Sequence, residues 1–124
     1  MATKKTLGEK LRELRESYDL SQSQIASALN IDRSTYSNYE LDRTQPNLET
    51  LVKLARIFNV PGEALLPEFD DEGTSFRELL PSHGMVNSLS KDERGMVAQF
   101  RALSAADRER IRSEIDDLAN NSGK

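Results

Sequence analysis

One segment, LSQSQIASALNIDRSTYSNYELDR from Leu20 to Arg43, constrains the fold of this chain more than any other. Its first part predicts a short helix, because Ser21 and Gln24 have the spacing of a capping box. Three apolar residues at helical spacing give that helix a buried side: Ile25, Ala28 and Leu29. The helix should end at Asn30, since asparagine tolerates the left-handed backbone conformation found at many helix ends.

A second short helix is predicted directly after this turn. Asp32 can cap its N-terminus, and Tyr36 and Tyr39 are spaced so that both face the core. The residues left on the outer face are small or polar: Arg33, Ser34, Ser37 and Asn38. A helix with such a face suits insertion into a groove lined by hydrogen-bonding groups. The segment therefore predicts a helix-turn-helix motif.

Further capped segments on either side of this motif complete a set of five short helices over residues 1–67. Thr6 and Glu9 form a capping box ahead of apolar residues at helical spacing: Leu7, Leu11, Leu14 and Tyr18. After the motif, Asn47 can cap a helix that ends at Asn59. A last short helix follows, after Pro61. Short helices with brief connections predict an all-α bundle.

The chain from Met1 to Leu66 resembles the Cro/phage-repressor (Xre-like) helix-turn-helix family. The matching residues keep the family's spacing: Leu20-Ser21-Gln22, Ile25-Ala26, Leu29-Asn30-Ile31, Ser34-Thr35-Tyr36-Ser37, Tyr39-Glu40, Pro46-Asn47-Leu48, Leu51, Leu54 and Ala55. Two positions depart from it: Asn30 replaces the usual turn glycine, and Leu41-Asp42 replaces an Asn-Gly pair. The resemblance implies a lambda-repressor-like domain that binds double-stranded DNA.

The second helix of the motif carries most of the candidate DNA contacts. Arg33 can clasp a guanine edge, or it can contact a phosphate; Asn38 can pair with adenine, or it can remain a solvated polar residue. Small Ser34 and Ser37 permit close approach. The predicted DNA-binding residues are Gln22, Arg33, Ser34, Thr35, Ser37, Asn38 and Arg43, of which Gln22 is assigned to a phosphate by the resemblance. The family pattern also pairs Arg15 with Glu40, although Arg15 is equally readable as an ordinary surface residue.

The remainder of the chain predicts a linker at 68–89 with a short amphipathic segment, two helices over 90–119, and a disordered tail at 120–124. Apolar residues mark one side of each helix: Met96, Val97, Phe100, Leu103, Ile111, Ile115 and Leu118. An isolated helical hairpin offers too little shared core to fold alone. This segment therefore either forms a homodimer with a second copy or folds back on its own domain.

Composition excludes several classes of protein. The chain has no cysteine, its single histidine lies in an irregular stretch, and its glycines form no phosphate-binding loop, so we expect no metal, no cofactor and no enzymatic activity. No apolar run is long enough for a bilayer, and we expect a cytoplasmic protein. The net charge of −4 comes entirely from residues after Leu66, because nine basic and nine acidic residues balance before it.

Taken together, these features predict a sequence-specific transcriptional regulator, with a dimeric repressor that reads an inverted repeat as the leading interpretation. The alternative is an antitoxin-like or partner-regulated protein whose acidic C-terminal half binds another protein. The two differ in what the apolar residues from Met96 to Leu118 contact.

Overall fold

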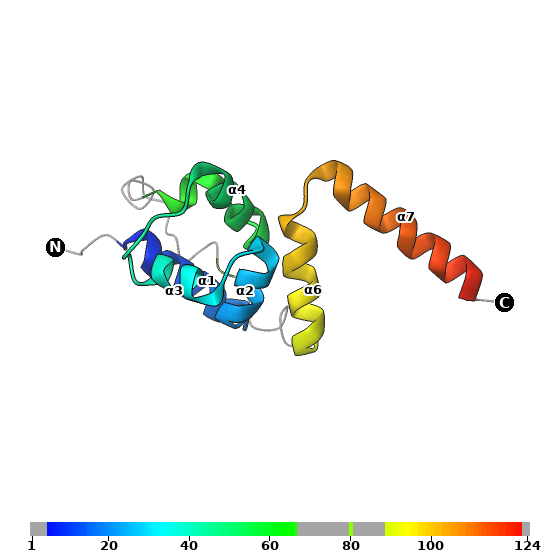
Figure 1. The fold of residues 1–124 in the computed structure, drawn as a ribbon, viewed down its shortest axis with the longest axis horizontal. Coiled ribbons are helices and arrows are strands. Elements are labelled where there is room, and N and C mark those ends of the chain that lie inside the picture. The colour runs from blue at the N-terminus through cyan, green and yellow to red at the C-terminus, as the bar shows by residue number, and fades with distance from the viewer. Residues whose placement is uncertain (1–4, 67–79, 81–88, 123–124) are drawn as a thin grey trace.

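The described residues of the computed structural model, 5–66, 80 and 89–122, form helices joined by short turns and contain no strand (Figure 1). The elements in order are α1 (Leu7–Ser17), α2 (Gln22–Leu29), α3 (Arg33–Glu40), α4 (Leu48–Ile57), the 3₁₀ helix η1 (Gly62–Leu65), α6 (Lys91–Ala102) and α7 (Ala105–Ser122). The all-α prediction and the helix-turn-helix at α2–α3 are confirmed.

Side-chain caps begin most of these helices where the sequence predicted them. Capping boxes start α1 at Thr6, α2 at Ser21 and α6 at Ser90. Asn47 starts α4 by accepting a hydrogen bond of 2.9 Å from the Thr50 N–H. Asp32 takes the predicted N-cap position of α3 with an extended backbone, but its side chain makes no capping hydrogen bond.

The first four helices all end in the same way, with an Asn or Asp in the left-handed conformation. These residues, at φ of 54–59°, are Asp19, Asn30, Asp42 and Asn59. At each end one backbone bond returns three residues and the next returns five, as in Ile31 N–H to Ala26 O at 3.0 Å. This is the Schellman arrangement, in which glycine is the usual residue. Asparagine or aspartate thus takes the place of glycine at all four helix ends.

The core lies between α1, α2, α3 and α4. Its fully buried side chains include Leu11, Leu14, Ile25, Tyr36, Leu54 and Phe58. Lys10 is also fully buried. Its ammonium group donates to the carbonyl oxygens of Ala64 at 3.0 Å and Leu66 at 2.7 Å, and so it satisfies the end of η1.

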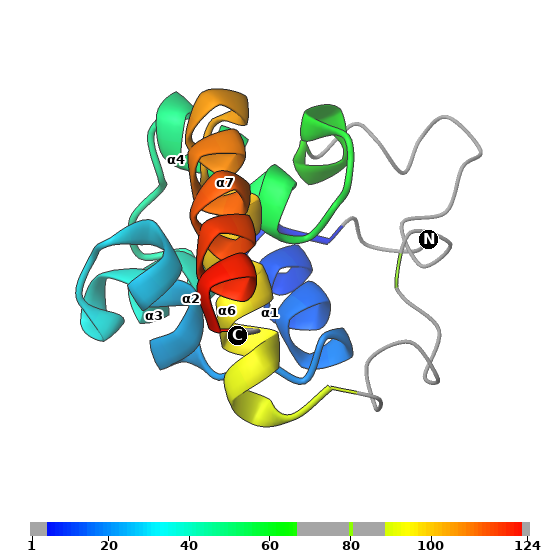
Figure 2. The same cartoon turned by 90° about the vertical axis from the view of Figure 1, so that its right-hand side faces the viewer.

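Helix α6 packs on its own N-terminal domain, against α2 and α4. The predicted apolar side was partly wrong, because Met96 is exposed whereas the small residues Ala98 and Ala102 are buried. Small side chains allow the close approach: a Cβ at Gly95 would lie 2.9 Å from the Gln24 amide nitrogen. Seen from the α7 side, α6 lies between α7 and the bundle (Figure 2).

Helix α7 diverges from α6 after the turn at Leu103 and Ser104 and leads away from the bundle (Figure 1). The expected hairpin is therefore open, with only α6 folded back on the domain. Helix α7 continues through Ser122, so residues 120–122, predicted as disordered, are helical; nothing in the sequence after Ala119 forces a stop. Of the predicted linker at 68–89, all residues except Leu80 and Leu89 lie outside the described part.

Candidate nucleic-acid interface

The outer face of α3 presents the predicted polar residues to solvent. Arg33 and Ser34 are exposed in its first turn, and Ser37 and Asn38 are half-buried one turn later. On the opposite side, Tyr36 is fully buried and Tyr39 packs against the core, with the two rings edge to face at 6.3 Å. This division fixes the rotation of α3, so its polar side points outward.

A charged network attaches the end of α3 to α1 and α2. Arg15 donates two hydrogen bonds to the Glu40 carboxylate, at 2.6 and 3.1 Å, and a third to the Leu20 carbonyl at 3.0 Å. Gln22 donates from its amide to the same carboxylate at 3.0 Å. The side chains of Arg15 and Glu40 are only 14% and 4% exposed. The pairing implied by the family pattern is therefore present, and it is a buried, bidentate contact rather than a surface one.

The ionisation of this network follows from its geometry. Burial alone would raise the pKa of the Glu40 carboxyl, but the hydrogen bonds from Arg15 and Gln22 outweigh it and hold that pKa below its usual range. The same contact raises the pKa of Arg15. Burial, with the nearby Glu40 carboxylate, raises the pKa of the Tyr36 phenol. The Tyr36 hydroxyl interacts with the Glu40 carboxylate and helps to lower its pKa, but it makes no hydrogen bond of ordinary geometry with a described residue.

The start of α1 is pressed against the end of α3, and sequence reasoning missed this junction. Asp42 accepts a hydrogen bond of 2.6 Å from the Thr6 hydroxyl and one of 3.0 Å from the Gly8 N–H. The carboxylate thereby caps α1 from the exit of α3. Gly8 is needed for the approach, because a Cβ there would lie 2.3 Å from the Glu40 carbonyl oxygen.

The structure brings five of the seven predicted contact residues together on α3: Arg33, Ser34, Thr35, Ser37 and Asn38. Gln22 lies at the first position of α2, and its amide is oriented by the hydrogen bond to Glu40. Arg43 lies past the end of α3 and is exposed. Neither Arg33 nor Arg43 forms an ion pair within the described part of the chain. No helix in that part is long and apolar enough to span a membrane.

Comparison with known proteins agrees with this geometry. Residues 11–65 match the family described as Helix-turn-helix. The chain is 36% identical over 86 residues to the cryptic phage CTXphi transcriptional repressor RstR of Vibrio cholerae, an alignment that covers 68% of this chain and 75% of that protein.

Two further relatives match shorter stretches. The transcriptional regulator ImmR of Bacillus subtilis is 39% identical over 61 residues (49% of this chain, 48% of ImmR), and the immunity repressor protein of Bacillus phage phi105 is 32% identical over 63 residues (51% and 44%). No solved structure matches. The chain thus spans three quarters of the first relative and about half of the other two. It belongs to the Xre-like helix-turn-helix family of DNA-binding transcriptional regulators, which are not enzymes.

Proposed function

We propose that this chain is a cytoplasmic, dimeric repressor that reads an inverted repeat in double-stranded DNA with α3 in the major groove. The observation that carries the proposal is the open polar face of α3 combined with a fixed inner face. Tyr36 anchors the middle of the helix in the core, and Glu40 anchors its end to Arg15 and Gln22. A rigidly held helix with exposed hydrogen-bonding groups suits direct readout of base edges.

Each predicted contact has a role that its position supports. Arg33, at the start of α3, clasps a guanine, and Asn38 pairs with adenine. Gln22, Thr35 and Arg43 contact phosphates around the groove, which positions the helix without reading sequence. The remaining residues, Ser34 and Ser37, are short enough to let the backbone of α3 approach the bases.

The charge balance of the N-terminal domain predicts modest binding to random DNA. Its nine basic and nine acidic residues up to Leu66 cancel, and Arg15 is committed to Glu40. Few side chains are then left to release counterions from phosphates, so the salt dependence of binding should be shallow. Discrimination has to come from base contacts instead.

The decisive experiment compares Arg33→Ala with Lys91→Ala, which removes an equal charge from an exposed residue at the start of α6. On the selected operator, Arg33→Ala should weaken binding by about 10- to 100-fold, the loss of one bidentate contact of ~1–3 kcal/mol. Lys91→Ala should bind like the wild type. Equal losses on operator and random duplex with Arg33→Ala would show that Arg33 touches only phosphate.

In vitro selection of bound duplexes tests the dimeric part of the proposal separately. A symmetric dimer should recover two inverted half-sites whose centres lie about one helical turn, or ~34 Å, apart. Recovery of a single, unrepeated half-site would contradict the dimer while leaving the recognition helix intact.

A further inference from the structure

Two apolar surfaces of this chain face solvent, and they lie on different elements. The first is the α7 stripe, which consists of Ile111, Ile115 and Leu118 and is 37–68% exposed. The second lies on α4, where Leu48 is 76% and Val52 41% exposed. Large exposed apolar patches on a water-soluble surface mark sites of interaction.

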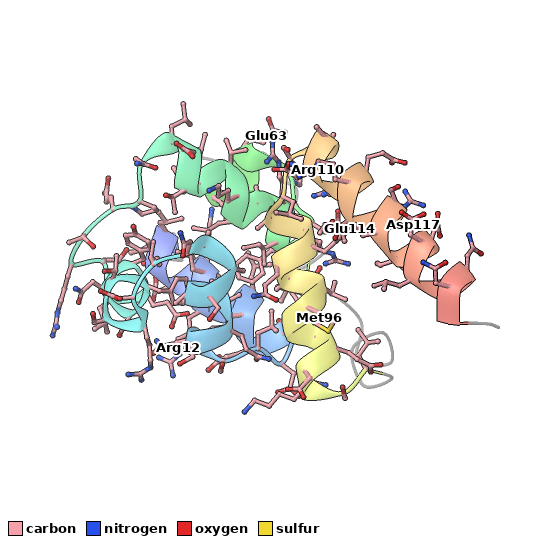
Figure 3. All side chains as sticks on the ribbon, turned by 45° about the vertical axis from the view of Figure 1, so that its right-hand side comes forward. Arg12, Glu63, Met96, Arg110, Glu114 and Asp117 are labelled. Atoms are coloured by element: carbon pink, nitrogen blue, oxygen red, sulfur yellow. The ribbon has the colours of Figure 1, made fainter. Side chains whose placement is uncertain are left out.

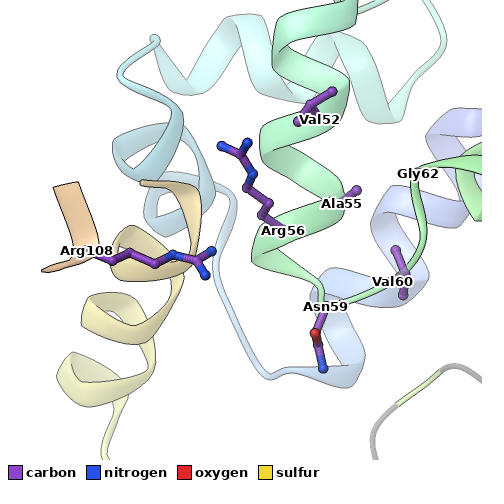
Figure 4. Close-up of a pocket in the computed structure, with 7 residues that line it drawn as sticks. All are labelled: Val52, Ala55, Arg56, Asn59, Val60, Gly62 and Arg108. Carbon is purple, nitrogen blue, oxygen red and sulfur yellow. The ribbon is translucent and has the colours of Figure 1, made fainter. Parts of the chain in front are cut away.

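The α4 surface forms one wall of a groove of about 680 Å³, here called the α4 groove. It is lined by the end of α2, the outer side of α4 and the turn between α6 and α7, and its lining includes Leu29, Leu48, Val52, Arg56, Leu103 and Asp107. A second hollow of about 420 Å³ adjoins it through Val52 and Arg56. Figure 4 shows Arg56 from α4 and Arg108 from α7 reaching into the space between their helices.

The chain's own α7 does not cover this groove. Helix α7 begins at the rim, where Asp107 is a lining residue, and then leads away from the bundle (Figure 1). Every described residue from Glu109 to Asn121 is exposed. Most of the stability of a helix in a protein comes from packing its apolar face, and the described part of the chain does not cover that face of α7.

Charge makes the α7 stripe and the α4 groove complementary. Of the acidic residues after Arg112, Glu114 borders the α7 stripe, whereas Asp116 and Asp117 lie on the other side of the helix; Glu114 and Asp117 are labelled in Figure 3. At the groove, Arg56 is exposed and forms no ion pair with any described residue, whereas both lining carboxylates are already paired, Glu49 with Lys53 at 3.7 Å and Asp107 with Arg110 at 3.8 Å. An apolar helix face edged by the Glu114 carboxylate thus matches an apolar groove edged by the unpaired Arg56.

We propose that the α7 stripe of one copy docks in the α4 groove of a second copy, and that the α7 stripe of the second copy docks in the α4 groove of the first. The proposal builds on the dimer proposed above and names its interface. At 1.5 Å per residue, α7 is about 27 Å long, which is enough to cross a neighbouring small domain. In a two-fold symmetric dimer this contact is made twice, so both exposed surfaces of both copies become buried. No residue of α3 lines the α4 groove, so the polar face of α3 stays free for DNA.

Crosslinking tests the contact directly, because the chain has no cysteine of its own. Val52→Cys protein is mixed with differently tagged Ile115→Cys protein and treated with a short bis-maleimide. We expect a crosslinked product that contains one chain of each kind. Glu109→Cys, exposed on another side of α7, is the control and should give little product with Val52→Cys. Abundant self-crosslinking of Ile115→Cys would instead show α7 pairing with α7, and it would overturn the proposal.

A charge exchange tests the same interface in solution without any crosslinker. Glu114 borders the stripe, one residue before Ile115 and three after Ile111. In analytical ultracentrifugation, Arg56→Glu and Glu114→Arg should each raise the dimer dissociation constant about tenfold, and the double variant should recover most of that loss. Glu109→Arg should have no effect.

The outcome separates this interface from the proposed function. The docking of α7 on a second copy would be overturned by a monomeric wild-type protein. It would also be overturned if the double variant lost as much dimer affinity as the two single variants together. Binding of Ile115→Asp protein to a single half-site reports on α3 alone. If that binding persists while the dimer is lost, the proposal that α3 binds DNA holds, whether or not α7 forms the dimer interface.

Discussion

Replacing Gly8 with alanine should loosen the junction between α1 and the end of the recognition helix. The new Cβ would lie 2.3 Å from the Glu40 carbonyl oxygen, 2.7 Å from the Tyr39 carbonyl oxygen and 2.8 Å from an Asp42 carboxylate oxygen. Two of these atoms belong to the backbone of the last turn of α3. They cannot move aside unless the end of α3 moves with them.

The size of the effect follows from two opposing contributions. Overpacking of this kind costs up to about 3 kcal/mol when backbone must shift. Alanine also has a higher helix propensity than glycine, which returns roughly 1 kcal/mol. We therefore expect Gly8→Ala to lower the free energy of unfolding by about 2 kcal/mol, or the Tm by about 8 °C at ~4 °C per kcal/mol.

Gly62→Ala is the matched control, because a Cβ at Gly62 would meet no atom within 4 Å. Urea denaturation followed by circular dichroism should show Gly8→Ala clearly less stable than Gly62→Ala, and Gly62→Ala at least as stable as the wild type. Affinity for the operator should also fall for Gly8→Ala at a temperature where it is folded. If the two variants unfolded at the same urea concentration, the close approach of α1 to α3 would be refuted.

Substitutions at three further positions probe the same region, each checked by urea denaturation. Tyr36→Phe removes a buried hydroxyl that interacts with the Glu40 carboxylate without a hydrogen bond of ordinary geometry, so the free energy of unfolding should change by less than about 1 kcal/mol; a larger loss would reveal a hydrogen bond to that carboxylate. Glu40→Gln should cost about 2 kcal/mol at pH 7. Since the folded-state pKa of Glu40 lies below its ordinary 4.5, this contribution is complete above pH 4.5 and is lost as the pH falls through the lowered value, so the variant's deficit should shrink in acid. Asp42→Ala should cost about 1 kcal/mol through the lost cap of α1, and Asp42→Asn less, because the amide oxygen still accepts.

The parts of the fold that could be predicted from the sequence are those decided within a few residues. A capping box depends on positions three apart, so the starts of α1, α2 and α6 were predicted correctly. The ends at Asn30 and Asn59 were predicted for the same reason. The outward face of α3 followed from the spacing of Tyr36 and Tyr39.

The parts that escaped prediction depend on partners far along the chain. Lys10 is buried because η1 offers it two carbonyl oxygens, and Ala64 is 54 residues away. Asp42 caps α1 through residues 34 and 36 positions earlier, which no local pattern reveals. Helix α6 buries Ala98 rather than Met96 because the surface it meets on α2 and α4 favours close approach, and that surface exists only once the domain has formed.

The four left-handed helix ends also bear on how fast the domain finds its structure. Each reversal is secured by hydrogen bonds that return no more than five residues, so the change of direction between successive helices is settled locally. Little loop-closure entropy opposes such steps. Refolding of the N-terminal domain should therefore be rapid, in the range of roughly microseconds to milliseconds that is usual for helical proteins with local contacts. The Gln24 amide, in contrast, donates to the Lys91 carbonyl 67 residues away, and a contact between such distant residues forms more slowly. The docking of α6 on the domain is therefore the step that stopped-flow measurements should resolve.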